Sequence, residues 1–227
     1  MNERDQLVQA LTPTVMVPRF EAFEPLDRPG HRFLVVADGL WLEVRRSWLY
    51  ARQRIARQEA VAMPYGVLAP AITFLCPPIP AAIVQKFSAL ARRECPREAA
   101  GWVVWNENTG VFVFREVEAI TASAGHIRYH RPMLEAGEHL VMDWHSHGSG
   151  RAFFSGTDNR DDRGEVKVSG VLGCCDQERV DMVIRLCLLG TFIRLNARVS
   201  GDRIVFDEAV EDAKGANPWN TSFIPAC

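Results

Sequence analysis

The stretch that most restricts the fold of this 227-residue chain covers residues 140–158 and reads LVMDWHSHGSGRAFFSGTD. Its apolar first part predicts a β-strand over 140–147, on which side chains two positions apart share a face. His145 and His147 are therefore expected to project together. Ser155 and Asp158 stand three positions apart at the expected start of a helix, where both can face the same side as the imidazoles.

Two imidazoles and one carboxylate are a suitable protein ligand set for a catalytic zinc ion. His145, His147 and Asp158 would leave the fourth tetrahedral position to water, whereas a structural zinc ion would use four protein ligands. Ser155 adds a hydroxyl beside these ligands. The segment therefore predicts an open, hydrolytic metal site.

Each part of this segment also has an ordinary structural interpretation. Ser-x-x-Asp is a helix-capping pattern, and capping is compatible with metal binding because a helix start holds a side chain in place. A His-x-His pair also occurs on protein surfaces and in cores. Asp143 is expected on the same strand face as the histidines, either in contact with a metal ligand or simply in solvent.

Amide hydrolysis at zinc also needs a general base, and the sequence offers Glu98. This residue lies in CPREAAGWVVW, before an apolar strand and after a helix expected over 80–93. Pro80 suits the first turn of that helix, and its apolar residues recur at helical spacing. A rigid carboxylate at this junction fits the role of base, while an ordinary solvated glutamate is the alternative.

Glu98 and the segment His-Ser-His, seven residues, Ser, two residues, Asp together resemble the signature of the JAMM (MPN-plus, or JAB) metallopeptidases. That family removes ubiquitin or ubiquitin-like proteins by cutting isopeptide or peptide bonds. The resemblance implies zinc ligands at His145, His147 and Asp158, a general acid/base acting on zinc-bound water at Glu98, and oxyanion stabilisation by Ser155. Gly148 departs from the pattern, because many members have proline there, and this departure bears on the rigidity of the loop.

The resemblance implies an α/β fold: a curved mixed β-sheet flanked by helices, of the JAB/MPN, cytidine-deaminase-like type. The metal segment and the chain length are also similar to the bacterial PRTRC system protein A subgroup, which is encoded beside a ThiF-like adenylating protein and a small ubiquitin-like protein. These two proteins are the expected partners, the second as substrate. Two alternatives stay open: a hydrolase of small amides or sulfur-carrier adducts, and a non-catalytic or latent scaffold that binds ubiquitin-like partners.

The chain divides into a β-rich N-terminal extension (1–75), a metallopeptidase domain (76–210) and an irregular tail (211–227) in which Trp219 and Phe223 would pack on the core. The extension contains a hairpin pattern over 32–44, two apolar runs around Asp38-Gly39. It is expected to dock a substrate or partner, or to brace the core. Three apolar runs over 166–199 predict further strands, and the segment 203–210 predicts either another short strand or the start of a helix.

The composition restricts partners and compartment. The net charge is −2 and no block of Lys or Arg occurs, so direct nucleic-acid binding is not expected; the basic stretch 45–58 reads as a solvated face. The sequence has no secretory signal and no apolar run that would cross a membrane. Six cysteines lack a Cys-x-x-Cys pair, and Cys174, Cys175 and Cys187 are expected as buried thiols. These features favour the cytoplasm.

His126 and His130 stand four positions apart and are interpreted as ordinary loop or strand residues.

Overall fold

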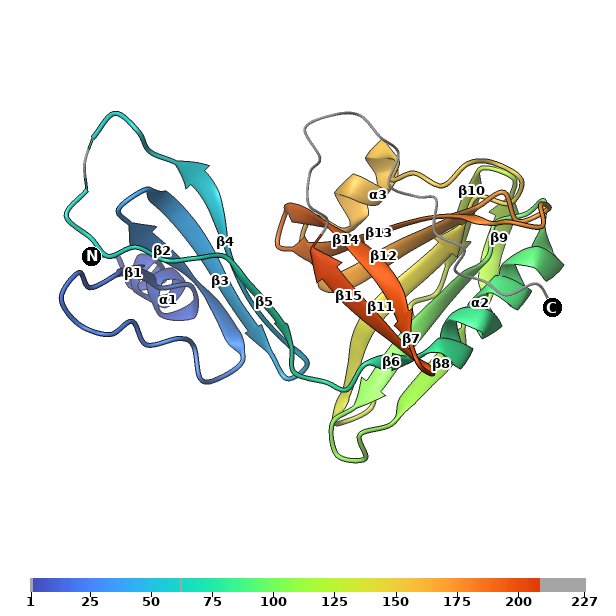
Figure 1. Ribbon diagram of the computed structural model, residues 1–227, viewed down its shortest axis with the longest axis horizontal. Helices are drawn as coiled ribbons and strands as arrows, with labels where there is room; N and C mark the ends of the chain where they lie inside the picture. The colour runs from blue at the N-terminus through green and yellow to red at the C-terminus, as the bar shows by residue number, and fades with distance from the viewer. Residues whose placement is uncertain (1, 62, 209–227) are drawn as a thin grey trace. The chain divides into compact units, whose positions relative to one another are not determined.

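The computed structural model describes residues 2–61 and 63–208, so the predicted tail at 211–227 lies outside the described residues. The chain forms two compact units, Met1–Cys76 and Pro77–Cys227 (Figure 1). No helix among the described residues is both long enough and apolar enough to cross a bilayer.

The first unit consists of a helix, α1 (Glu3–Leu11), and a five-stranded sheet in the order β1-β2-β3-β4-β5. The strands are β1 (Thr14–Met16), β2 (Gly30–Val36), β3 (Gly39–Arg46), β4 (Leu49–Arg57) and β5 (Ala71–Phe74). The hairpin predicted at 32–44 is confirmed, since Val36 pairs with Gly39 across the turn. The helix α1 was not predicted, and it buries none of its residues.

An apolar cluster around Leu34, Val36 and Trp41 forms the core of this unit. The carboxylate of Glu43 is fully buried beside it and accepts hydrogen bonds from Arg32 and from the hydroxyl of Tyr50. The basic stretch 45–58 is solvated only in its second half, because β4 begins buried and ends exposed.

The second unit is built on an eight-stranded curved sheet (Figure 1) in the order β6-β15-β14-β13-β12-β11-β7-β8. Its strands are β6 (Ile79–Pro80), β7 (Ala100–Asn106), β8 (Phe112–Glu116), β11 (Glu138–Ser146), β12 (Val166–Gly173), β13 (Asp181–Leu188), β14 (Thr191–Ser200) and β15 (Arg203–Glu208). Only β11 and β12 pair in parallel. The predicted mixed α/β sheet is therefore present, but the unit is rich in strands: its described residues form just two helices, α2 (Ala81–Glu94) and α3 (Gly156–Asp161).

The helix α2 matches the prediction over 80–93 to within one residue and packs on one face of the sheet. The ring of Phe87 lies 5.4 Å from that of Trp144 on β11. Gly170 on the next strand makes room for this indole, because a Cβ there would lie 2.6 Å from it. Within this helix Ser88 is buried and Ala89 exposed, since Ser88 falls within the helical sector that faces the sheet.

The strands predicted over 166–199 correspond to β12, β13 and β14, and the segment from 203, for which a strand or a helix start was open, forms the strand β15. A hairpin that was not predicted, β9 (Ala119–Ser123) with β10 (His126–Tyr129), forms a separate two-stranded sheet. Cys175 and Cys187 are buried as expected, whereas Cys174 is half-buried.

Candidate metal centre

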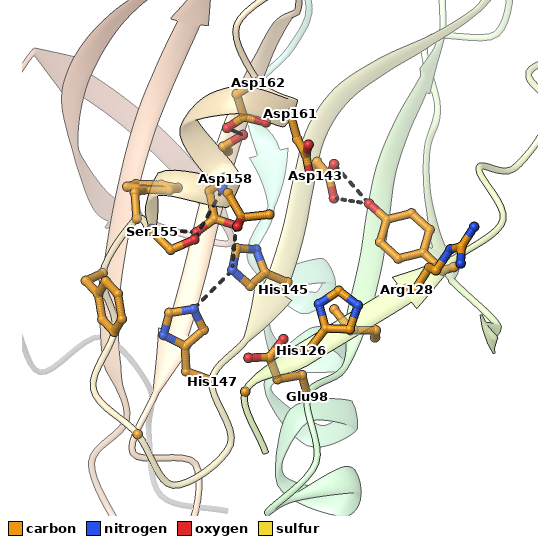
Figure 2. Close-up of a pocket in the computed structure, with 18 of the residues that line it drawn as sticks. Glu98, His126, Arg128, Asp143, His145, His147, Ser155, Asp158, Asp161 and Asp162 are labelled. Carbon is orange, nitrogen blue, oxygen red and sulfur yellow. Dashed lines mark hydrogen bonds and ion pairs between the residues drawn. The ribbon is translucent and has the colours of Figure 1, made fainter. Parts of the chain in front are cut away.

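Of the two histidines of the predicted site, His145 lies near the end of β11 and His147 directly follows this strand. This strand lies inside the sheet between β7 and β12, so its backbone is held on both sides. Trp144 faces α2 and His145 faces the opposite side, as strand alternation requires. The Nε2 atoms of His145 and His147 are 3.2 Å apart, which confirms that the two imidazoles project together (Figure 2).

Asp158 reaches these imidazoles from the first turn of α3. Ser155 is the N-cap: its hydroxyl accepts a 3.2 Å hydrogen bond from the Asp158 amide, and the Ser155 amide donates to Asp158 Oδ2 at 2.6 Å. The other oxygen, Asp158 Oδ1, lies 3.5 Å from His145 Nε2. Asp158 therefore takes part in the helix cap through Oδ2 and approaches the histidines through Oδ1, so both predicted roles occur together.

The donor set fits a zinc ion. One nitrogen or oxygen atom from each of His145, His147 and Asp158 lies within 4.8 Å of the others. Nδ1 of His147 is 3.0 Å from the carbonyl oxygen of Arg151, which can only accept, so Nδ1 carries a proton and Nε2 is the atom that can bind a metal ion. Burial lowers the pKa of His145 despite the nearby charge of Asp158, so this ring is neutral at neutral pH. Neutral imidazoles with one carboxylate are ligands that zinc accepts.

Glu98 lines the same groove, which has a volume of about 840 Å³. Its side chain is not solvated, since the residue is only 7% exposed. Burial, followed by the charge of Asp158, raises the pKa of Glu98 to about 7. Its backbone amide donates to the carbonyl of Ser123 at 2.8 Å, so the hairpin of β9 and β10 helps to hold it.

The loop after His147 is held by backbone hydrogen bonds. Gly148 has φ +53°, which proline, with φ near −65°, does not adopt. A Cβ at Gly148 would lie 2.2 Å from the carbonyl oxygen of Pro96, so glycine is required here. The carbonyls of Gly148 and Gly150 accept from the amides of Cys175 and Cys174 at 2.8 and 2.7 Å. Glycine rather than proline at position 148 is therefore what this backbone requires, and the loop is anchored to the residues that follow β12.

One wall of the groove was not anticipated from the sequence. It is formed by the turn and second strand of the β9–β10 hairpin, namely Ala124, Gly125, His126, Ile127, Arg128 and Tyr129. His126 therefore lies on the candidate site, although it was interpreted as an ordinary loop or strand residue. Nothing local in these residues marks them, because they become part of the site only through the fold.

The floor of the groove holds a second feature that the sequence did not reveal. Asp143 is not solvated: it accepts a hydrogen bond from Lys167 Nζ at 2.8 Å and one from the Tyr129 hydroxyl. Asp162 is also buried and pairs with Lys167 and Arg185. Charged residues are usually exposed unless they are paired, so their pairing could not be inferred from local sequence.

Comparison with known proteins separates the two units. Residues 2–75 match the family described as a domain of unknown function (DUF2016), and residues 80–186 match the family described as prokaryotic homologs of the JAB domain. None of the curated proteins matches the chain. A solution structure of a protein from Desulfitobacterium hafniense covers 58% of this chain and 90% of its own length, at 14% identity and a TM-score of 0.38. The family match over residues 80–186, a little under half of the chain, supports a place for this domain in the JAB/MPN superfamily.

Proposed function

We propose that the second unit is a zinc-dependent peptidase that hydrolyses a peptide or isopeptide bond at the C-terminal tail of a ubiquitin-like protein. The observation that carries this proposal is the convergence of His145, His147 and Asp158 in a groove that also contains Glu98, a carboxyl group of raised pKa. Residues with a purely structural role would not need to present partly exposed nitrogen and oxygen ligands to a groove beside a buried carboxyl group.

His145, His147 and Asp158 are the residues that would hold the metal ion. The chemistry that zinc supplies in such a site is polarisation of a carbonyl and acidification of water. The Glu98 carboxylate can take a proton from water and return it to the departing nitrogen. A pKa near 7 suits both steps, because the group is then neither too weak a base nor too weak an acid at neutral pH.

Ser155 is placed to assist the same reaction. Its hydroxyl oxygen accepts the Asp158 amide proton, which leaves its own hydroxyl hydrogen free to donate. Donation to the carbonyl oxygen of a bound substrate would favour the tetrahedral state, an effect typically of ~3 kcal/mol.

The shape of the groove favours an extended substrate. Strand β10 lines one wall, and within the described part of the chain it pairs on one side only, with β9. A peptide tail lying along its open edge could form main-chain hydrogen bonds, which suits a glycine-rich tail with few side chains to recognise. A ThiF-like adenylating protein is proposed as a second partner.

The test is turnover of a ubiquitin-like protein that carries a short C-terminal extension, compared with a short peptide amide. The wild-type protein loaded with zinc should release the extension, and Glu98→Gln should keep zinc but lose turnover. A matched control is Glu94→Gln, a carboxylate at the end of α2 that does not line this groove.

Equal turnover by wild type and Glu98→Gln would rule out the proposed reaction. Cleavage of the peptide amide alone would favour a hydrolase of small amides. Turnover that appears only after the ThiF-like protein is added would identify a latent enzyme.

A further inference from the structure

The helix that carries Asp158 is not held by apolar packing. α3 contains six residues and none of them is buried. A helix of this length is not stable by itself in water. Another interaction must therefore fix the distance between Asp158 and the histidines of β11.

That interaction is a buried ion-pair network at the end of α3. Asp162, the C-cap residue, is 5% exposed. Its Oδ1 lies 2.9 Å from Lys167 Nζ, and its Oδ2 lies 2.7 Å from Arg185 Nη2 and 2.8 Å from the hydroxyl of Ser169. These three donors, which come from β12 and β13, converge on one carboxylate.

Arg185 holds the helix at a second point. Its Nη1 donates to the side-chain oxygen of Asn159, one residue after Asp158. The guanidinium group lies between the rings of Phe154 and Phe192, 3.8 and 4.0 Å from their centres. A planar group enclosed by two rings has a fixed orientation. The guanidinium group therefore constrains the position of the helix and also neutralises the charge of Asp162.

Lys167 connects this helix to the strand of the histidines. Its Nζ is 2.8 Å from Asp143 Oδ2 and 2.9 Å from Asp162 Oδ1, and the residue is 4% exposed. Asp143 precedes His145 by two positions on β11. A single ammonium group therefore bridges the two elements that supply the ligands. Burial alone would lower the pKa of Lys167, but its two carboxylate partners raise it, so the bridge keeps its charge.

We infer that Lys167, Asp162 and Arg185 are positioning residues that hold α3 against β11 and thereby set the metal affinity of the site. This inference rests on the proposed metal site. The network contains two carboxylates and two cations, Asp143 and Asp162 with Lys167 and Arg185, so its own charge is balanced. A buried ion pair often adds little net stability over apolar residues of the same volume, so we assign this network the role of specifying one arrangement of α3.

The experiment measures zinc affinity by competition with a chelator, together with the absorption spectrum of the cobalt-substituted protein. Asp162→Asn removes the carboxylate charge at the C-cap of α3 and leaves Lys167 paired with Asp143. Asn159→Ala removes only the second contact of Arg185, at a less buried position. Arg115→Met is the matched control, because Arg115 pairs with Glu138 on β11 at 2.6 Å and does not contact α3.

Asp162→Asn and Asn159→Ala should weaken zinc binding by roughly 10- to 100-fold, as loss of a residue that orients a ligand typically does. Their cobalt spectra should shift toward that of Asp158→Ala, while Arg115→Met keeps the wild-type affinity and spectrum. A loss of folding would instead lower the far-ultraviolet circular dichroism of the metal-free protein, and Asn159→Ala is the variant least exposed to that effect.

Two negative outcomes are distinguishable. If the wild-type protein binds zinc and both variants bind it equally well with unchanged cobalt spectra, the positioning role is wrong and the metal site stands. If the wild-type protein binds no zinc, the metal site is wrong and the positioning role fails with it.

Discussion

The hydroxyl of Ser146 accepts a 2.9 Å hydrogen bond from the backbone amide of Ala99, the residue after Glu98. Ser146 is fully buried and lies between the two candidate ligands on the strand. Its own amide donates to the carbonyl of Ala99 at 2.9 Å, so the two segments are joined twice. The distance between the candidate base and the candidate ligands is thus set by a residue that touches neither substrate nor metal.

Removal of this hydroxyl should affect turnover and stability together. Ser146→Ala leaves the Ala99 amide buried without a partner, which costs about 1–3 kcal/mol of unfolding free energy. Denaturant unfolding measures that loss, and turnover should fall while zinc is retained. Ser146→Thr, which keeps the hydroxyl, is expected to recover most of the activity. Equal unfolding free energies for Ser146→Ala and wild type would contradict this role.

Metal content should depend on the cluster and not on histidines in general. His145→Ala and Asp158→Ala are expected to lose bound zinc, measured by elemental analysis of the dialysed protein. His139→Ala is the control, since His139 lies on the same strand but faces Glu107 at 3.0 Å. Retention of stoichiometric zinc in both cluster variants would show that the metal binds elsewhere.

The two roles of Ser155 can be separated by one substitution. Glycine is tolerated at an N-cap, so Ser155→Gly should cost only a few tenths of a kcal/mol in stability. It removes the hydroxyl, however, and turnover should fall by roughly 10²–10³-fold if that group donates to the substrate. Thermal unfolding and initial rates measure the two effects. A large loss of stability with little loss of rate would assign Ser155 to capping alone.

The metal-free protein should become more stable when Glu98 is replaced. Its pKa is about 7 when folded, against an ordinary value of 4.5. Between these values the folded state binds a proton that the unfolded state has lost, so stability falls as pH rises through this window and stays lower above pH 7. Glu98→Gln should therefore gain about 1–3 kcal/mol at pH 8 and nothing at pH 4, measured by urea unfolding with chelator present.

Glu94→Gln serves as the control for this measurement, because the side-chain hydrogen bond from Arg93 contributes most to lowering the pKa of Glu94 against the opposing effect of burial. This variant should show no gain at pH 8. The same pH dependence in both variants would assign the effect to general charge rather than to the groove.

Features encoded within a short stretch were predictable from sequence. Period-two alternation placed His145 and His147 on one face, and the three-residue step from Ser155 predicted the helix that carries Asp158. The Asp38-Gly39 turn likewise predicted its hairpin. In each case the residues that decide the structure are neighbours in the chain.

Features that depend on distant partners were not predictable. Lys167 forms an ion pair with Asp143, 24 positions away in the sequence, and Arg185 forms one with Asp162, 23 positions away. Read singly, each of these residues favours solvent, and only the fold supplies the opposite charge that permits burial. The contribution of the β9–β10 hairpin to the site was not predicted either. Its residues line the groove only because the fold brings them there.

The elements that carry the ligands are anchored in different ways, and they should therefore open at different free energies. β11 is hydrogen-bonded to strands on both sides, so the amide of His145 can exchange with solvent only when the sheet opens. α3 is attached through side-chain charges and buries no residue, so it belongs to the part of the domain that opens at low free energy. On warming, Asp158 should therefore separate from the histidines before the domain unfolds, and metal release should precede loss of the fold.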